Sequence, residues 1–585
     1  MRTSFLLLVS CCVLLAGCDL EQNPVAETSR EAVFNNENGL ALYTNSFYNM
    51  LPSADDITRG DGISDYGARK PAPDFIVAGA YDARSSDGGW SWSALRNINY
   101  FLANNVDPAV PEAVRQHYNG LVRFFRAWFY FEKVKRYGDV PWIDKPLDVD
   151  DPSLYAGRDP REVVMQHVLE DINFAIDNIA MTNDASRTMI TRDVALAFKS
   201  RIALFEGTFR KYHPEWGLSD TADEWLNEAV SAAREIMDSG RYSLYEGAGE
   251  DMSYRRLFTS DDPVASEIML AVVSDLGLGV THTANWTYTS GTFWVRYSFI
   301  RTFMNTYLNI DGTPFTDREG YETMTFMEEV KGRDKRLQQT IRMGDYTRTN
   351  SGISVPAPPA FTYTWTGYQP IKWTLDEIAI DGGSRNTNAV SIFRYAEVLL
   401  NYAEAKAELG TITDADWAET VGALRRRAGI TGGLNSLPTQ VDPYLQQVYF
   451  PDIANPVILE IRRERAIELV LEGFRFYDLV RWKRGDLMEM QWNGMYVPSV
   501  NQYMDLNEDG TPDVYFATVM PEERIDGVVY IDVTGPEDRL ANGTSGEITI
   551  LNTIPRVWED RHYLYPIPEV HLLKNPALGQ NPGWE

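Results

Sequence analysis

Long amphipathic segments constrain the fold of this chain more than any other feature of its sequence. In residues 112–138 (EAVRQHYNGLVRFFRAWFYFEKVKRYG), large apolar side chains recur at spacings of three and four, which places them on one face of an α-helix. Similar patterns occupy 160–180, 191–208, 221–239, 393–410, 414–428 and 457–483. Consecutive segments of this length predict a mainly α fold built from helical-hairpin repeats.

The region from about 241 to 392 has a different composition. Aromatic and β-branched residues are interrupted there by Gly, Pro, Asn and Asp, as in THTANWTYTSGTFWVRY (281–297) and PAFTYTWTGYQPIKW (359–373). Such patterns predict a loop-rich insertion that contains short strands. The expected organisation is one body over 18–585, with helical repeats at about 36–240 and 393–490, the loop-rich region between them, and an irregular C-terminal part at 491–585.

The first 17 residues predict a secretory signal peptide. Arg2 gives a positive start, and the apolar run over residues 5–15 is too short to span a bilayer. The sequence Leu-Ala-Gly-Cys at 15–18 resembles a bacterial lipobox, which implies that Cys18 is lipidated and becomes the first residue of the mature chain. An ordinary secretory signal with a chance cysteine is the alternative.

Charge and cysteine content narrow the possible partners. The formal net charge is −29, from 83 acidic and 54 basic residues. Such a surface repels nucleic acid and anionic lipid, so we expect no nucleic-acid partner. The lipid attached to Cys18 must therefore anchor the protein to the membrane. Cys11 and Cys12 lie in the signal peptide, so the mature chain has no internal disulfide.

Five segments resemble, in family order, the signatures of the SusD/RagB family. They are RFFRAWFYFEKVKRYGDVPWID (123–144), ALAFKSRIALFEGT (195–208), FRYAEVLLNYAEAKAELG (393–410), ILEIRRERAIELVLEGFRFYDLVRWKRGD (458–486) and YLYPIPEVHLLKNPALGQNPGW (563–584). The resemblance implies tetratricopeptide-like helical pairs in a lipoprotein at the outer surface of the outer membrane. It also implies capture of oligosaccharides or other nutrients for a TonB-dependent, SusC-like transporter barrel, which such a protein covers as a lid.

The most specific of these segments also has a physical interpretation. In the helix predicted for 457–483, four glutamates recur every four residues, and like charges at this spacing destabilise an isolated helix. These glutamates are Glu460, Glu464, Glu468 and Glu472. We expect guanidinium groups to neutralise them as bidentate partners. The expected arginines are Arg463, Arg465, Arg475 and Arg481.

No catalytic constellation is recognisable in the sequence. The six histidines lack the spacing of a zinc site, and the chain has no GxSxG motif and no P-loop. A glycosidase needs only two carboxylates, but Glu397 and Glu404 lie about 10.5 Å apart along a helix axis, wider than typical pairs. We therefore expect a protein that is not an enzyme. A lipid-anchored glycoside hydrolase and a peptide-binding member of the same family are the alternatives.

The segment DLNEDGTPD (505–513) matches part of a calcium-binding loop. Its ligand positions hold Asp505, Asn507, Asp509, Thr511 (through its carbonyl) and Asp513, and Gly510 stands at the sharp turn. Position 12 is Phe516 instead of the usual bidentate Glu. The segment thus predicts a free-standing structural Ca²⁺ site, with an Asx-rich turn as the alternative.

Tryptophan and tyrosine residues suggest where a glycan would bind. Their faces pack against sugar C–H surfaces, and their N–H or O–H groups hydrogen-bond hydroxyls. The resemblance implies ligand contacts from 87–105 and 281–297, and a third aromatic segment near residue 365 can contribute. The candidate ligand-binding residues are Trp90, Trp92, Trp286, Tyr288, Trp294, Tyr297 and Trp365. For each of them, the alternative is a half-buried core aromatic.

Overall fold

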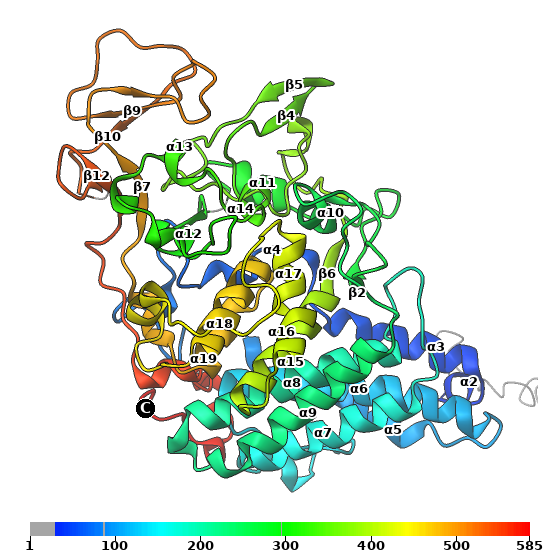
Figure 1. Ribbon diagram of the computed structural model, residues 1–585. Coiled ribbons are helices and arrows are strands. Elements are labelled where there is room, and N and C mark those ends of the chain that lie inside the picture. Colours follow the sequence, from blue (N-terminus) through cyan, green and yellow to red (C-terminus); the bar gives the residue numbers. More distant parts are fainter. Residues whose placement is uncertain (1–29, 86–87, 294, 537) are drawn as a thin grey trace, which may run out of the picture.

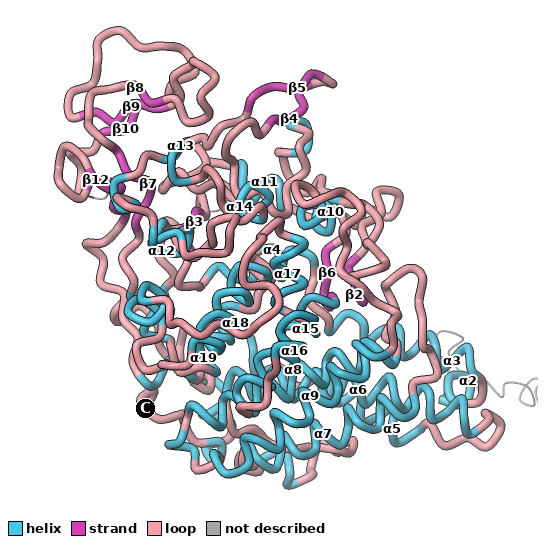
Figure 2. Tube along the Cα trace, viewed as in Figure 1, coloured by secondary structure: helices cyan, strands magenta, loops and turns pink. Residues whose placement is uncertain are grey.

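The computed structural model describes residues 30–85, 88–293, 295–536 and 538–585. The signal peptide, Cys18 and Trp294 therefore lie outside the described residues. Long helices form one end of the molecule, and short strands and loops form the other (Figure 1). Figure 2 shows the same division by secondary structure, with most of the strands far from the helical layer.

The helical end is built from hairpins of long helices. These are α5 (Ser93–Asn104), α6 (Glu112–Tyr137), α7 (Arg161–Asn178), α8 (Arg192–Tyr212), α9 (Ala222–Asp238), α15 (Tyr395–Glu408) and α18 (Pro456–Glu468). Helix α6 packs on α7, and α8 packs on α9. Helix α15 packs on α8, α9 and α18, so the C-terminal helices complete the layer that the N-terminal ones begin.

Shorter helices connect these elements. They are α2 (Arg30–Phe34), α3 (Glu37–Asn45), α4 (Ala54–Thr58), α10 (Ser253–Thr259), α11 (Ala284–Thr289), α12 (Arg301–Met304), α13 (Phe326–Glu329), α14 (Arg336–Thr340), α16 (Asp414–Glu419), α17 (Val421–Arg427), α19 (Arg475–Arg481) and α20 (Glu569–Lys574). None of the described helices is long and apolar enough to cross a membrane.

The strands form five small sheets. Three are antiparallel pairs: β1 (Gly67–Ala68) with β3 (Ser298–Phe299), β2 (Ile268–Val272) with β6 (Val390–Arg394), and β4 (Thr347–Asn350) with β5 (Ile353–Pro356). Two are three-stranded: β11 (Asp538–Leu540), β12 (Gly546–Ile550) and β7 (Asn493–Val497), and β10 (Val529–Asp532), β9 (Val514–Ala517) and β8 (Tyr503–Met504). The region expected to be irregular thus holds two ordered sheets.

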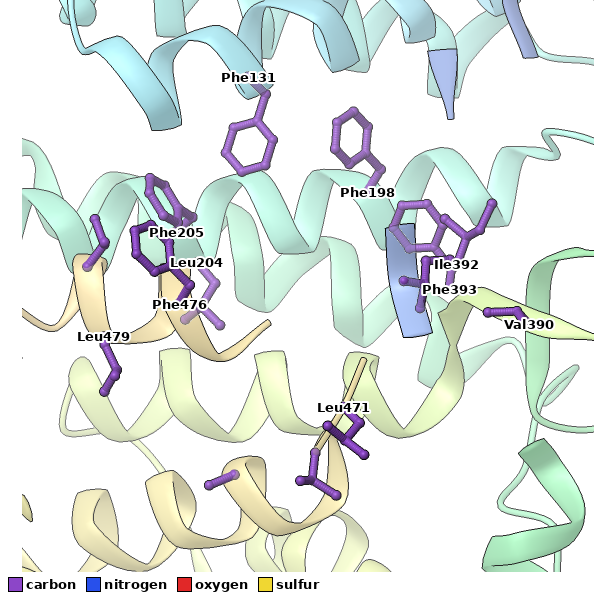
Figure 3. Close-up of a cluster of buried hydrophobic side chains, with 14 of the residues drawn as sticks. Phe131, Phe198, Leu204, Phe205, Val390, Ile392, Phe393, Leu471, Phe476 and Leu479 are labelled. Carbon is purple, nitrogen blue, oxygen red and sulfur yellow. The ribbon is translucent and has the colours of Figure 1, made fainter. Parts of the chain in front are cut away.

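One hydrophobic cluster extends from Phe34 to Trp584. Figure 3 shows its central part, where Phe131 of α6 and Phe198 of α8 lie above Phe393 of β6. The Phe198 ring lies 5.8 Å from that of Phe131 and 6.0 Å from that of Phe393. Segments from both ends of the chain therefore share one core.

The helix predicted for 457–483 is two helices, α18 and α19, because tertiary contacts break it. The backbone turns through left-handed conformations at Leu471 (φ 59°) and Gly473 (φ 80°). Asp61 accepts hydrogen bonds from the backbone N–H groups of Gly473 (2.9 Å) and Arg475 (3.1 Å). A Cβ atom on Gly60 would lie 2.7 Å from the Cα of Gly473. Only glycine permits this approach, so residues 60–61 fix the turn.

The glutamate stripe is buried and neutralised, but mostly by other arginines than expected. Glu468 forms ion pairs with Arg336, Arg394 and Arg427. Glu464 forms them with Arg336 and Arg425, and Glu460 forms them with Arg425 and Arg463. Glu472 forms them with Lys372 and Arg394. Of the expected four, Arg463 meets the stripe, whereas Arg465, Arg475 and Arg481 pair with Asp478, Asp65 and Glu404. The stripe faces residues 336–427, which supply the remaining cations.

Candidate ligand-binding site

Three segments that are distant in sequence meet in the loop-rich half. Strand β1 pairs with β3, and the Lys70 backbone N–H donates to the Val295 carbonyl (3.3 Å). The same carbonyl accepts a hydrogen bond from the Trp365 indole Nε1 (3.0 Å). These bonds place residues 67–70, 295–299 and 364–368 side by side.

Trp365 is held in a fixed orientation at this junction. Its backbone N–H donates to Ser298 Oγ (2.9 Å), in addition to the bond from its indole. The Lys70 Nζ lies 4.1 Å from the ring centroid, and the Arg296 guanidinium carbon lies 4.5 Å from it. The ring is half-buried. Both cations are close enough for cation–π attraction.

Beside Trp365 lies a cavity of about 440 Å³, which we call the Trp365 cavity. It is lined by Arg296, Phe361, Thr362, Thr364, Trp365, Phe516, residues 529–533, Arg539 and Ile548. Its volume falls within the range of small-molecule sites, about 300–1,000 Å³. Strand β10 is an edge strand of its sheet and forms one wall.

Trp286 forms a second half-buried aromatic group. Its ring stacks on Phe293, with centroids 3.6 Å apart and an interplanar angle of 13°. The Arg59 guanidinium carbon lies 5.1 Å from the Phe293 centroid. Trp286 lies on α11, and Arg296, which lines the Trp365 cavity, follows Phe293 by three positions in the sequence.

The structure corrects three of the expected ligand-binding residues. Trp90, Tyr288 and Tyr297 are 3%, 2% and 1% exposed. The Tyr288 hydroxyl donates to the Thr58 carbonyl (2.6 Å), and the Tyr297 hydroxyl lies 2.9 Å from Ser64 Oγ. A sugar platform requires an accessible ring face, so these three residues belong to the core.

Trp92 is half-buried and packs on the helical end of the molecule. Its ring meets Phe129 edge-on at 5.5 Å and Tyr130 at 6.2 Å, both on α6. Trp90 and Trp92 thus both contact α6, whereas Trp286 and Trp365 lie in the loop-rich part. Trp294 lies outside the described residues.

Arg296, Arg539 and Tyr530 line the cavity but were not expected from the sequence. Short continuous runs of β-branched and aromatic residues in DVYFATV (513–519) and GVVYIDV (527–533) could have indicated the strands that bring Tyr530 there. Nothing in the local pattern marks Arg296, because its role depends on three distant segments meeting.

A family model described as the SusD family matches residues 266–584, more than half of the 585-residue chain. The chain belongs to the SusD family. The resemblance found in its sequence motifs is confirmed.

Individual relatives match nearly the full length of this SusD family member. A SusD-like protein of Bacteroides ovatus is 23% identical over 612 residues, covering 100% of this chain and 98% of that one. SusD-like protein P2 of Formosa agariphila is 23% identical over 502 residues, covering 81% and 89%. Both proteins are similar to this chain along most of their own length.

Solved structures show the same fold. A SusD-like protein from Bacteroides fragilis superposes with a TM-score of 0.69 at 22% identity, covering 96% of this chain and 99% of that one. A SusD-like carbohydrate-binding protein from the same organism gives 0.68 at 18% identity, covering 94% and 100%. The expected mainly helical, tetratricopeptide-like fold with short strands is confirmed.

In this SusD family member, the acidic side chains of the loop 505–513 mostly bond to its own backbone. Asp505 accepts hydrogen bonds from the N–H groups of Asn507 (3.1 Å) and Gly510 (2.8 Å), and Asp509 accepts one from Thr511 (2.8 Å). Asp513 accepts one from the Leu506 N–H (2.7 Å). Burial raises the pKa of Asp513 to about 6, with a smaller contribution from the Asp505 and Asp509 carboxylates.

The described residues contain no group of three or more His, Cys, Asp or Glu side chains that could hold a metal ion. The hydrogen bonds at 505–513 are those of an Asx-rich turn, and calcium binding stays a prediction of the sequence.

We expect Asp505→Ala to lower stability by about 1 kcal/mol, equally in calcium and in EDTA, because it removes two turn hydrogen bonds. Thermal melting of both proteins in both buffers measures this. A calcium-dependent rise in the wild-type melting temperature, lost in the variant, would establish the calcium site instead. Such a site is worth about 2.7 kcal/mol at a hundredfold excess of metal over its Kd.

The carboxylates considered for catalysis are ion-paired. Glu397 receives two hydrogen bonds from Arg201 (2.6 and 2.7 Å), and Glu404 receives two from Arg481 (2.5 and 2.8 Å). Burial opposes ionisation of Glu404, but the Arg481 charge outweighs it and lowers the pKa to about 2. A general acid requires a raised pKa, so Glu404 is not suited to that role.

Proposed function

We propose that this protein is a cell-surface lipoprotein that binds oligosaccharides and delivers them to a TonB-dependent outer-membrane transporter. Membership of the SusD family supports this, together with the lipobox at 15–18. A protein of the same fold is described as carbohydrate-binding. The Trp365 cavity is the feature of this chain that best fits such a ligand.

The Trp365 cavity combines the groups that sugar recognition needs. Trp365 presents a half-buried aromatic face, and Thr362 and Thr364 also line the cavity. Sugars pack their C–H faces on aromatic rings and exchange hydroxyl hydrogen bonds with polar neighbours. Because its indole and backbone are both hydrogen-bonded, Trp365 is positioned before a ligand arrives.

The lining of the cavity supports binding without cleavage. Among the described lining residues, only Asp532 carries a carboxylate. Most glycosidases use a pair of carboxylates flanking the bond they break. We therefore propose a binding role and treat the lipid-anchored hydrolase as an outcome of the test below.

We expect Trp365→Ala to weaken oligosaccharide binding about tenfold, because the loss of an aromatic contact of roughly 1.4 kcal/mol changes Kd by that factor. Affinity electrophoresis against a glycan panel, followed by calorimetry on retained glycans, measures this. Trp365→Phe should retain part of the affinity. The control is Tyr155→Ala, which removes an aromatic residue that is 65% exposed and lies outside the cavity.

Three results would count against this proposal. Equal retention by the Trp365→Ala variant and wild type would exclude the cavity as the binding site. Release of reducing ends from a retained glycan would support the hydrolase. Capture of peptides with no glycan retained would support a peptide-binding member of the family.

The open edge of β10 is the observation that favours a peptide as the second candidate. An extended peptide can add a strand to an exposed sheet edge through main-chain hydrogen bonds. Among the described strands, β10 pairs only with β9, and the cavity lies against it.

The proposed transporter would dock on the loop-rich half, because a ligand held in the Trp365 cavity would be released there. Exposed apolar side chains mark an interaction surface only when they gather into one patch. They do not select this half by themselves, since Leu276 (70% exposed) and Leu278 (79%) lie within it and Val149 (94%) and Leu573 (78%) lie outside it.

A further inference from the structure

Arg296 differs from most buried or half-buried arginines of this protein. The arginines around the glutamate stripe each pair with two or three carboxylates. The Arg296 side chain instead donates from Nε to the Gly291 carbonyl (3.2 Å) and lies against the Trp365 ring. No carboxylate of the described residues forms an ion pair with it. In a chain of net charge −29, a half-buried guanidinium with no carboxylate partner among the described residues is able to bind an anionic group from outside.

Arg539 is a second cation in the lining of the cavity, and it is exposed to solvent. Its Nε donates to the Gly535 carbonyl (2.9 Å), and no described carboxylate pairs with it. Asp532 also lines the cavity, but it accepts hydrogen bonds from the backbone N–H (2.9 Å) and hydroxyl (2.6 Å) of Thr534. Two guanidinium groups thus line the site against one carboxylate that is already engaged.

The backbone holds Arg296 in an uncommon conformation. Its φ is 49°, in the left-handed region that residues other than glycine seldom adopt. The local energy cost must be offset by surrounding contacts. Strand β3 begins two residues later and is paired with β1, which fixes the loop that presents the guanidinium beside Trp365.

We propose that the Trp365 cavity takes an acidic oligosaccharide, whose sugar face packs on Trp365 and whose carboxylate or sulfate group is bound by Arg296 and Arg539. This rests on the proposed glycan-binding function and names its ligand class. Guanidinium groups bind both oxyanions through paired, charge-assisted hydrogen bonds. The rest of the surface repels anions, so the local cations select the acidic group and place it in the cavity.

The test compares acidic polysaccharides with neutral counterparts of the same backbone. One arm uses polygalacturonate and its methyl ester, and alginate and its propylene glycol ester. The other uses sulfated galactans and their desulfated forms. Wild-type mature protein should retain at least one acidic polymer about tenfold better than its neutral counterpart, since hydrogen bonds to a charged group are stronger than those to a neutral one. Binding should weaken as salt is raised from 0.05 to 0.5 M.

Arg296→Gln and Arg539→Gln should each remove most of this preference and flatten the salt dependence. The matched control is Arg84→Gln, which deletes the same charge from an exposed pair with Asp82 and should change neither. A melting temperature close to the wild-type value shows that each variant is folded. Retention by the polygalacturonate or alginate arm indicates a carboxylate ligand, and retention by the sulfated galactan arm indicates a sulfate ligand.

Retention of neutral glycans as strongly as acidic ones, unchanged in both arginine variants but lost in Trp365→Ala, would overturn the acidic ligand and leave the proposed function standing. Retention of no glycan in either arm or in a neutral panel would overturn both.

Discussion

Replacing Glu468 with Gln should destabilise the folded protein by about 3–5 kcal/mol, because removing one partner of a buried ion pair leaves uncompensated charge. Glu468 is fully buried and is shared by Arg336, Arg394 and Arg427. Urea unfolding followed by circular dichroism measures the loss. In the matched control, Glu508→Gln breaks an exposed pair with Lys331 and should cost less than about 1 kcal/mol. A similar small effect at both positions would contradict the role assigned to the buried network.

Lowering the pH provides a second comparison of stability between the wild type and the Glu468→Gln variant. Burial opposes ionisation of Glu468, but Arg427, Arg394 and Arg336 outweigh it and hold the pKa of this carboxyl well below its ordinary value. A depressed folded-state pKa means that the stabilisation is present above the unfolded value, about 4.3, and is lost as pH falls below it. The Glu468→Gln variant should therefore lose less stability than wild type between pH 5 and 3.

Replacing Cys18 with Ala should release the protein from the membrane fraction or leave it unprocessed. A lipidated terminus holds a bilayer firmly, since each buried methylene contributes about 0.8 kcal/mol and more than one chain is attached. Fractionation and surface labelling of intact cells measure the change, and Cys12→Ala, within the expected signal peptide, is the control. A Cys18→Ala protein at the surface at wild-type level would disprove the lipid anchor.

The long helices were predictable because their signal is local. The pattern in 112–138 matches α6 (Glu112–Tyr137) within one residue at its C-terminal end. The match is close because the spacing of apolar residues along this segment alone defines the buried face of the helix. The break between α18 and α19 was not predictable. It depends on Gly60 and Asp61, more than 400 residues earlier in the chain.

The binding site was predictable only in part. Trp365 and Trp286 are half-buried and remain candidates, but Trp90, Tyr288 and Tyr297 are in the core. An aromatic residue in a loop-rich sequence gives no local sign of which face meets solvent. Arg296 and Arg539 could not be identified from the sequence. They are candidates because no described carboxylate pairs with either of them, and only the fold reveals this. The sheet β8–β10 was missed because its strands are only two to four residues long.

The contact between residues 60–65 and 473–475 also sets the order in which the chain can fold. Asp65 and Arg475 are 410 positions apart, so their bidentate pair cannot form until most of the polypeptide has been synthesised. Closing so long a loop costs conformational entropy, and the contacts that offset this cost form only late in folding. The emerging N-terminal part therefore carries Asp61 and Asp65 without their partners and cannot complete its core. This late closure would suit the export proposed above, in which a chain passes unfolded through a narrow translocation channel.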